Sequence, residues 1–384
     1  MTSRIIAGGP GEFMTVRELI ATGSQTSIGH AVATAALTEH DWRPRPATTW
    51  LARARRRWFE REWPQHHARM RGTAEALGID PDADLVHVDG LSSVPTGSAC
   101  SASYCLPSST VGGHGLLGRN YDFFTASATE LFGMLTGEPV HSDKPPMASA
   151  PYLITSRPDD GPATTVLTMN ELDGCMDGIN EHGLTVVLLI ADAATATAPV
   201  DAEPQVGLSS AQLPRFLLDT CRTSDEAKQA LLGAKQYDLG VPLHYLIADA
   251  HGDAFVWERG RGGVEHILEP SGSTLCVTNH PLHEHPEPDR LPADNTETMA
   301  TYRRYQELAK NTTTGEITGD RLRAAMDTVR FTAENAIDYP IRTLWRTILD
   351  PAATTMSTHF YLGDNPDGTP RYSSEVTVSP TGQP

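Results

Sequence analysis

The chain contains few cysteines, and this limits the roles that its thiols can have. Its 384 residues contain five cysteines, at positions 100, 105, 175, 221 and 276. An odd number of widely scattered cysteines is a poor framework for disulfide bonds. The start of the chain has no cationic stretch followed by a long apolar core, so no secretory signal is predicted. We therefore expect free thiols in a reducing cytoplasm, where a cysteine is a small core residue or a nucleophile.

Long apolar runs and an excess of positive charge are also missing. No run of eighteen or more apolar residues is present, so no transmembrane helix is predicted. Lys and Arg number 30 against 48 Asp and Glu, for a formal net charge of −18. Nucleic acids and anionic membranes would repel such a chain, and we predict neither as a partner. No glycine-rich phosphate loop follows a predicted strand, so no nucleotide cofactor is expected.

The predicted secondary structure changes near residue 100. Residues 48–78 have the pattern of one or two amphipathic helices, interrupted at Pro64 and ended by Gly78. The arginines of this segment are predicted to form its solvated face: Arg53, Arg55, Arg56 and Arg57. Residues 1–99 are accordingly expected to be a helical region.

From residue 100 onward, short β-rich runs dominate the sequence. Helices are predicted within this part at residues 209–221, 224–234, 294–310 and 318–329. Strands in runs, with helices grouped between them, predict an α+β fold of antiparallel sheets covered by helices.

Cys100 lies where a cysteine could acquire its own base. A free thiol has a pKa of about 8.5 and needs a base to act as a nucleophile near neutral pH. The local signatures of papain-like and caspase-like cysteine enzymes are absent. Cutting the bond between Ala99 and Cys100 would create an α-amino group with a pKa of roughly 7.7–8.0, which suits it to take the thiol proton. The small, turn-prone residues 96–99 suit an exposed scissile bond.

Residues 100–124, CSASYCLPSSTVGGHGLLGRNYDFF, resemble the nucleophile hairpin of the N-terminal-nucleophile (Ntn) hydrolases. They are most similar to the isopenicillin-N acyltransferase family, with the choloylglycine hydrolases further off. The family pattern is met at Cys100, Ser101, Gly118, Asn120, Tyr121 and Asp122. Further similar stretches follow in the family's order, at residues 178–189, 277–282 and 343–351. Ahead of the hairpin, residues 59–79 resemble the family's propeptide helix, and the residues before Met14 look like an extra leader.

This resemblance covers most of the chain and implies its architecture. It implies a four-layer αββα sandwich with antiparallel sheets. It also implies self-cleavage between Ala99 and Cys100. Residues 1–99 would be a helical propeptide that becomes the α chain, and residues 100–384 would be the catalytic β chain.

The resemblance also implies roles for four side chains. Cys100 would be the nucleophile, and Asp122 would hydrogen-bond its freed ammonium or its thiol. Arg119 would lie beside the thiol and favour the thiolate, as in the choloylglycine hydrolases. Asn279 would donate to the tetrahedral oxyanion, with a second donor from the backbone near Ile190.

Each of these side chains also has a purely structural interpretation. Cys100 would then be a buried thiol, Asp122 a turn acid, and Asn279 a turn residue. Cys105, five residues along the same predicted strand, should face away from Cys100 and pack in the core. The chain departs from the family with Ala99 in place of Gly before the cut. It also has Thr301 where Arg is expected, with Arg303 and Arg304 nearby.

A histidine-rich stretch, with His280, His283, Glu284 and His285, invites a metal interpretation. Structural zinc sites need a second ligand cluster, and the sequence offers none. We therefore predict neither a metal nor a cofactor.

The sequence thus predicts an autoprocessed enzyme that forms a thioester at Cys100. It would be a linear-amide hydrolase or an N-acyltransferase, acting on a small-molecule N-acyl amide or acyl-thioester. Its own α and β fragments would stay partners after cleavage, and a homo-oligomer is left open. The alternative is an unprocessed, non-catalytic protein of the same fold that binds or scaffolds.

Overall fold

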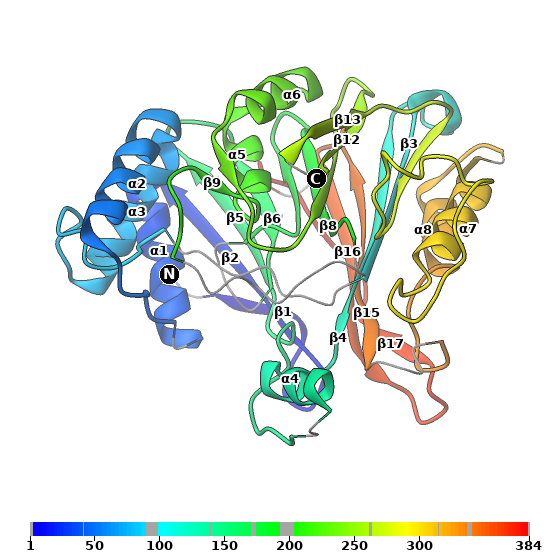
Figure 1. The fold of residues 1–384 in the computed structure, drawn as a ribbon, viewed down its shortest axis with the longest axis horizontal. Helices are drawn as coiled ribbons and strands as arrows, with labels where there is room; N and C mark the ends of the chain where they lie inside the picture. Colours follow the sequence, from blue (N-terminus) through cyan, green and yellow to red (C-terminus); the bar gives the residue numbers. More distant parts are fainter. Residues whose placement is uncertain are drawn as a thin grey trace.

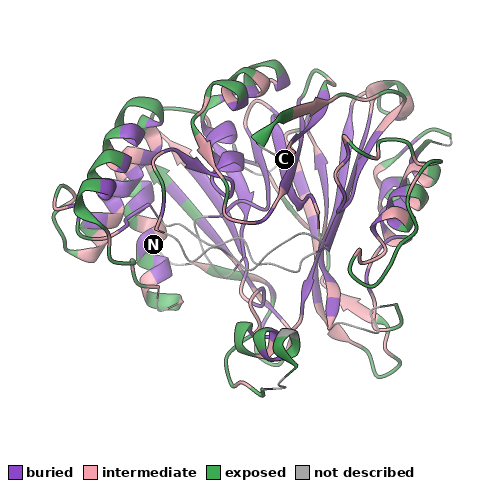
Figure 2. Cartoon of the chain, viewed as in Figure 1, coloured by how far each residue is buried: buried purple, intermediate pink, exposed green. Residues whose placement is uncertain are grey.

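In a computed structural model, the protein is described over residues 3–40, 42–89, 99–137, 140–169, 174–192, 203–260, 263–313, 315–335 and 340–382. Two large sheets face each other, and helices cover the outer surface of both, so the layers run α, β, β, α (Figure 1). Buried residues concentrate in the two sheets and on the helix faces that pack against them (Figure 2). The predicted α+β sandwich is therefore confirmed. The small residues 96–98 lie outside the described residues. Ala99 and Cys100, which flank the expected cut, are both buried, so the expectation of an exposed scissile bond was wrong.

The first sheet has nine strands and is almost wholly antiparallel. The pair β2 and β5 is its parallel exception. Its order is β1 (Arg4–Gly8), β2 (Thr15–Gly23), β5 (Tyr152–Pro158), β6 (Thr164–Leu167), β7 (Asp177–Asn180), β8 (Thr185–Ile190), β11 (Leu243–Ala248), β12 (Ala254–Arg259) and β13 (Glu265–Leu268).

The second sheet carries the hairpin that begins at Ala99. Its order is β14 (Thr274–Val277), β3 (Ala99–Cys105), β4 (Leu116–Phe124), β15 (Ile341–Asp350), β16 (Thr355–Asp364) and β17 (Pro370–Tyr372), with β18 (Val376–Val378) also paired to β16. A small parallel pair joins β9 (Leu208–Ser209) to β10 (Gln236–Tyr237).

The register of β3 against β4 determines which side chains meet. Cys100 lies opposite Tyr121, and Ala102 lies opposite Arg119. Because side chains alternate along a strand, these residues face the nine-stranded sheet. Cys105 has the opposite parity, as predicted, and its neighbours there are Ser103 and Cys276.

Helices form the two outer layers. The nine-stranded sheet is covered by α1 (Gln25–Glu39), α2 (Thr49–Glu62), α3 (Pro64–Leu77), α5 (Leu213–Thr220) and α6 (Ser224–Gly233); the second sheet is covered by α7 (Thr301–Thr313) and α8 (Gly319–Asp327) (Figure 1). A short helix, α4 (Ala128–Thr136), and a 3₁₀ turn, η1 (Pro107–Ser109), complete the set. Among the described residues, no helix is long and apolar enough to cross a bilayer.

Local signals account for most helix boundaries. Pro64 begins α3, and Gly78 ends it in the left-handed conformation with φ 67°, as predicted. Thr223 caps α6, one residue ahead of the expected start. The helix predicted from residue 294 begins only at Thr301. Asp294 instead accepts the N–H groups of its first turn from outside the helix, at 3.1 and 2.8 Å.

The segment before Cys100 is built into the sandwich more deeply than a helical region would be. It forms α2 and α3, as expected from residues 48–78, but it also supplies β1, β2 and the unpredicted helix α1. Strand β2 pairs with β5 from Arg17 to Gly23, so this segment shares a sheet with the rest of the chain.

The arginines of α2 do not all face solvent. Arg55 is 1% exposed and forms an ion pair with Asp89 at 2.6 Å. Its guanidinium also donates to Gly207 O at 2.9 Å and to Gln212 Oε1 at 3.0 Å. Residue 55 falls on the helix stripe that holds the buried apolar residues of α2: Leu51, Ala52, Trp58 and Phe59. The prediction of a solvated Arg55 was wrong. This arginine is buried, and its hydrogen bonds connect the first 99 residues to the segment at 205–212.

We predict that Arg55→Ala destabilises the uncleaved protein by about 3–5 kcal/mol, because it leaves the carboxylate of Asp89 buried without its cation. The matched control is Arg57→Ala on the exposed face of α2, which should change the free energy of unfolding by less than about 0.5 kcal/mol. Urea unfolding in a Cys100→Ala background measures both. Equal effects for the two variants would contradict a structural role for Arg55.

Candidate active site

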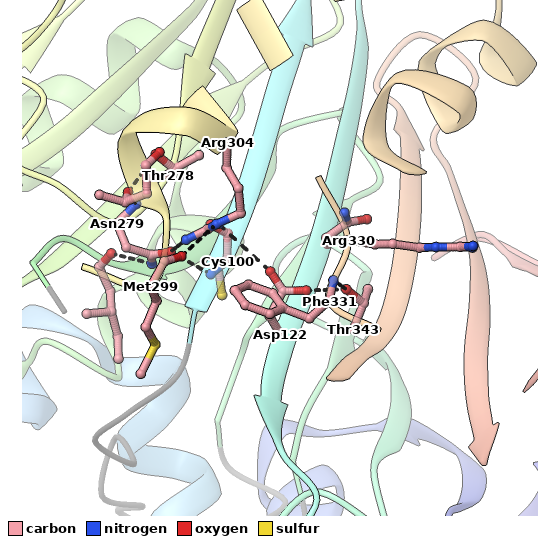
Figure 3. A network of polar contacts seen from close by, with 12 residues as sticks. Cys100, Asp122, Thr278, Asn279, Met299, Arg304, Arg330, Phe331 and Thr343 are labelled. Carbon is pink, nitrogen blue, oxygen red and sulfur yellow. Dashed lines mark hydrogen bonds and ion pairs between the residues drawn. The ribbon is translucent and has the colours of Figure 1, made fainter. Parts of the chain in front are cut away.

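Cys100 lies at the start of β3, between the two sheets, and is 1% exposed. Its backbone N–H donates to Asn279 Oδ1 at 2.8 Å. Its carbonyl oxygen accepts from Arg304 Nη1 at 2.7 Å. Its Sγ lies 3.5 Å from Arg119 Nη2. Asn279 and Arg304 thus converge on the backbone of Cys100, with Asp122 close by (Figure 3).

Arg119 is held beside the thiol by partners from the other sheet. It is fully buried, and its Nη2 donates to Leu188 O at 2.6 Å. Its Nε forms an ion pair with Asp177 Oδ1 at 2.5 Å. Trp345 Nε1 donates to the other oxygen of this carboxylate at 2.8 Å. The predicted placement of Arg119 is therefore observed.

Asp177 is a site residue that the sequence reasoning missed. It begins β7, directly before residues 178–189, one of the stretches that resemble the family. An acid at the start of a buried strand was the available signal, because a buried carboxylate needs a cation or several donors. Burial raises the pKa of Asp177, and the charge of Arg119 opposes this rise.

The thiol of Cys100 is not activated in the uncleaved chain. Burial raises its pKa to about 11, although the charge of Arg119 acts to lower it. A thiol with this pKa is almost wholly protonated near neutral pH, and the thiolate is the attacking form. Arg119 alone therefore does not produce a thiolate here.

Asp122 lies directly opposite Ala99, at the bond ahead of the nucleophile. Thr343 Oγ1 donates a short hydrogen bond to Oδ1 of this carboxyl group, and Arg304 Nη1 lies 4.0 Å from Oδ2. Burial raises the pKa of Asp122 to about 6, and the charge of Arg304 opposes the rise. A bond from Asp122 to the α-ammonium of Cys100 stays a prediction, because the peptide N–H of the uncleaved chain goes to Asn279.

Asn279 follows β14 and joins three segments. Its Oδ1 accepts from Cys100 N–H at 2.8 Å and from Arg304 Nη2 at 2.7 Å. Its Nδ2 donates to Ile190 O at 2.8 Å. The side-chain amide of Asn279 thus lies beside Cys100 and at the end of β8. The two expected oxyanion donors are this amide and a backbone N–H near Ile190. The contact at Ile190 is to the carbonyl oxygen, and the predicted donation to an oxyanion stays a prediction.

The family pattern has an arginine at position 301 of α7. In this chain two residues of the helix, Thr301 and Arg304, contact Asn279 instead. Thr301 Oγ1 accepts the backbone N–H of Asn279 at 2.7 Å. Arg304, about one turn further along the helix, reaches both Asn279 and Cys100 and is 4% exposed. Its guanidinium lies 5.2 Å above the ring of Phe331. The cation is therefore present, three residues later than the pattern suggested.

Two cavities adjoin this centre and offer room for a small molecule. One, of about 490 Å³, is lined by Met299, Arg304, Phe331 and Ile341, among others. Ala99 is fully buried in the same apolar cluster as Phe331 and Ile341. The other, of about 450 Å³, has walls that include Ala191, Trp257, Pro281 and Glu258.

The histidine-rich stretch makes contacts with protein groups. His283 Nδ1 lies 2.5 Å from Glu258 Oε1, and His280 Nε2 lies 3.2 Å from the carbonyl oxygen of His285. Burial lowers the pKa of His280 to about 4. Within the described ranges, no three His, Cys, Asp or Glu side chains are grouped so that they could hold a metal ion.

Comparison with solved structures finds a hydrolase, an acylase and an acid amidase ortholog at low sequence identity. A mutant conjugated bile acid hydrolase from Clostridium perfringens is 16% identical, with a TM-score of 0.46 over 73% of this chain and 92% of that one. Penicillin V acylase from Agrobacterium tumefaciens is 15% identical, with a TM-score of 0.45 over 68% and 83%. A Caenorhabditis elegans N-acylethanolamine-hydrolyzing acid amidase ortholog is 14% identical, with a TM-score of 0.41 over 73% and 99%.

Comparison with protein families gives a match over most of the chain, although no curated protein matches its sequence. The matching family is acyl-coenzyme A:6-aminopenicillanic acid acyl-transferase, and the match spans residues 109–365. It contains β4, β8, Asn279 and Arg304, and thus most of the centre described above. The chain belongs to the acyl-coenzyme A:6-aminopenicillanic acid acyl-transferase family of Ntn hydrolases, as the resemblance of its hairpin predicted.

Proposed function

We propose that this protein is an autoprocessed cysteine enzyme that forms a thioester acyl-enzyme on Cys100. It then passes the acyl group from an amide to water or to an amine, as a linear-amide hydrolase or an N-acyltransferase. The observation that carries the proposal is the placement of Cys100. Its backbone N–H donates a hydrogen bond to Asn279, its carbonyl oxygen accepts one from Arg304, and its sulfur lies beside Arg119.

The first step is cleavage of the chain before Cys100. The Sγ of Cys100 attacks the carbonyl carbon of Ala99, the bond from that carbon to the Cys100 nitrogen breaks, and the thiol proton passes to this nitrogen. Asn279 Oδ1, which accepts the N–H of Cys100, orients the leaving nitrogen. Water then hydrolyses the thioester, leaving a carboxylate on Ala99 and a free α-amine on Cys100. The buried thiol of Cys100 thereby gains a base that the uncleaved chain lacks.

The mature enzyme repeats this chemistry on a substrate. The α-amine takes the thiol proton, and Sγ attacks the substrate carbonyl carbon. Asn279 Nδ2, which carries a second N–H besides the one given to Ile190, stabilises the oxyanion. The substrate amine leaves with the proton. Water or a second amine then attacks the thioester and gives up a proton to the α-amine, and the departing thiolate takes this proton to become the thiol again.

The two fragments remain partners after the cut. Residues 1–99 contribute β1 and β2 to the nine-stranded sheet. A buried ion pair also joins Arg69 of this segment to Asp219 of α5 at 2.7 Å. Separating the fragments would expose a strand edge and uncompensated charges, so cleavage does not release the first fragment.

The first prediction of this mechanism concerns processing. The wild-type protein should run on a denaturing gel as pieces of about 11 and 31 kDa, in proportion to the 99 and 285 residues on either side of the cut in a chain of 41.5 kDa. Cys100→Ala should remain intact, because it lacks the attacking sulfur. Under native conditions the two wild-type pieces should elute together. N-terminal sequencing that places the cut elsewhere would overturn the mechanism, and an intact wild-type chain would favour a non-catalytic binding or scaffold protein.

The oxyanion role gives a second prediction. Asn279→Ala should lose about 3 kcal/mol of transition-state stabilisation, because one preorganised donor is removed. The loss should appear in kcat, since the oxyanion forms only in the transition state. Steady-state kinetics on the cleaved fraction measures it, with the exposed Asn365→Ala as the control. A change confined to KM would assign Asn279 to substrate binding instead.

Thiol labelling provides a third prediction. A limiting amount of alkylating agent should modify Cys100 in the cleaved protein and leave Cys105 free, because only Cys100 gains an adjacent amine. Uncleaved chain should be labelled slowly, since burial raises the pKa of its thiol to about 11. Peptide mass mapping along a processing time course would show label rising with the cleaved fraction. Label on Cys105 in proportion to lost activity would refute this assignment.

A further inference from the structure

Two buried side chains of the nine-stranded sheet hold the turn that follows Asn279. His244 on β11 is fully buried, and its Nε2 lies 3.0 Å from the carbonyl oxygen of His280. Glu258, directly opposite on β12, is 1% exposed and accepts two backbone N–H groups of the same turn, at 3.2 and 2.7 Å. The turn is thus fixed at three backbone positions within four residues of Asn279.

His244 and Glu258 are in direct contact. A carbonyl oxygen only accepts hydrogen bonds, so the contact with His280 requires a proton on Nε2 of His244. The Nδ1 of His244 lies 2.6 Å from Glu258 Oε2, within the distance of a buried ion pair. Burial acts to raise the pKa of Glu258, but the charge of His244 and the donors of His283 lower it to about 2. An ion pair with this carboxylate requires both ring nitrogens of His244 to carry a proton.

We propose that His244 and Glu258 are positioning residues that set the amide of Asn279 for catalysis. Their side chains hold the backbone carbonyl and N–H groups of residues 280–283 in place. This turn then determines how the side chain of Asn279 lies between Cys100 and Ile190. A displacement of about 1 Å at such a group costs up to about 10²-fold in rate. The inference rests on the role proposed above for Asn279.

Kinetics on three variants separate positioning from folding. Glu258→Ala should lower kcat at least about tenfold with KM within about twofold, because the misplaced donor acts in the transition state. Glu258→Gln keeps an acceptor for the turn and offers an N–H to neutral His244, so it should recover most of kcat. Asp89→Asn breaks a buried ion pair of the same kind on the far side of the sheet; it should lower Tm and leave kcat unchanged. Wild-type kcat in Glu258→Ala overturns the inference.

A spectroscopic measurement tests the charge of His244 without any activity. In ¹⁵N-histidine-labelled Cys100→Ala, the two ring nitrogens of His244 should both carry protons, with signals that vanish in His244→Gln. A neutral tautomer, with one bare nitrogen, overturns the ion pair. The kinetic outcomes are also distinguishable from failure of the proposed function. If Asn279→Ala is fully active, the oxyanion role fails and the inference falls with it; if Asn279→Ala is impaired and Glu258→Ala is not, the inference alone falls.

Discussion

The side-chain amide of Asn279 is the interaction on which the geometry of this centre depends. It joins β3, the strand of Cys100, to β8 of the opposing sheet and to Arg304 on α7. All of these groups are buried, and a buried polar group left without a partner costs about 1–3 kcal/mol. Moving any one of the three segments would leave at least one of these groups unsatisfied. Closure of the two sheets therefore places Cys100, and the donors around it, in one arrangement.

A second buried connection, between Arg119 and Asp177, governs the electrostatics beside the sulfur. It brings one fixed positive charge to the thiol, but the paired carboxylate and the loss of water limit its effect. Burial prevails, and the pKa of the Cys100 thiol stays at about 11. In the mechanism proposed above, the uncleaved chain has a nucleophile without a base and acts only on its own Ala99–Cys100 bond. Cleavage would supply that base at the nitrogen of Cys100, which already donates to Asn279.

Local sequence patterns were sufficient for much of this site. The β3–β4 hairpin was recognisable from residues 100–124, and with it the positions of Cys100, Arg119 and Asp122. What the sequence could not reveal comes from pairing across long separations. Asp177 meets Arg119 because β7 and β4 belong to different sheets that face each other, which no local pattern encodes.

Much of the fold could likewise be predicted from the sequence. Hydrophobic periodicity and the positions of Pro64 and Gly78 located the helices there, and the pattern of strands predicted antiparallel sheets covered by helices. The αββα layering was implied by the resemblance to the family. Strands β1 and β2 were missed; β2 pairs with β5, more than a hundred residues further along the chain, and β1 joins the sheet through β2. The exposure of Arg55 was predicted wrongly for a different reason, because its charge was given more weight than its position on the apolar stripe of α2.

The most direct test of the central claim is to trap the acyl group on the 100–384 fragment. Cleaved protein is mixed briefly with an N-acyl amide or an acyl-thioester, quenched in acid, and weighed by intact-mass spectrometry. The account predicts that the larger fragment gains the mass of the acyl group, that the group maps to the Sγ of Cys100, and that hydroxylamine removes it. Product formation without any adduct on this fragment, or with an adduct at another residue, would contradict a thioester at Cys100.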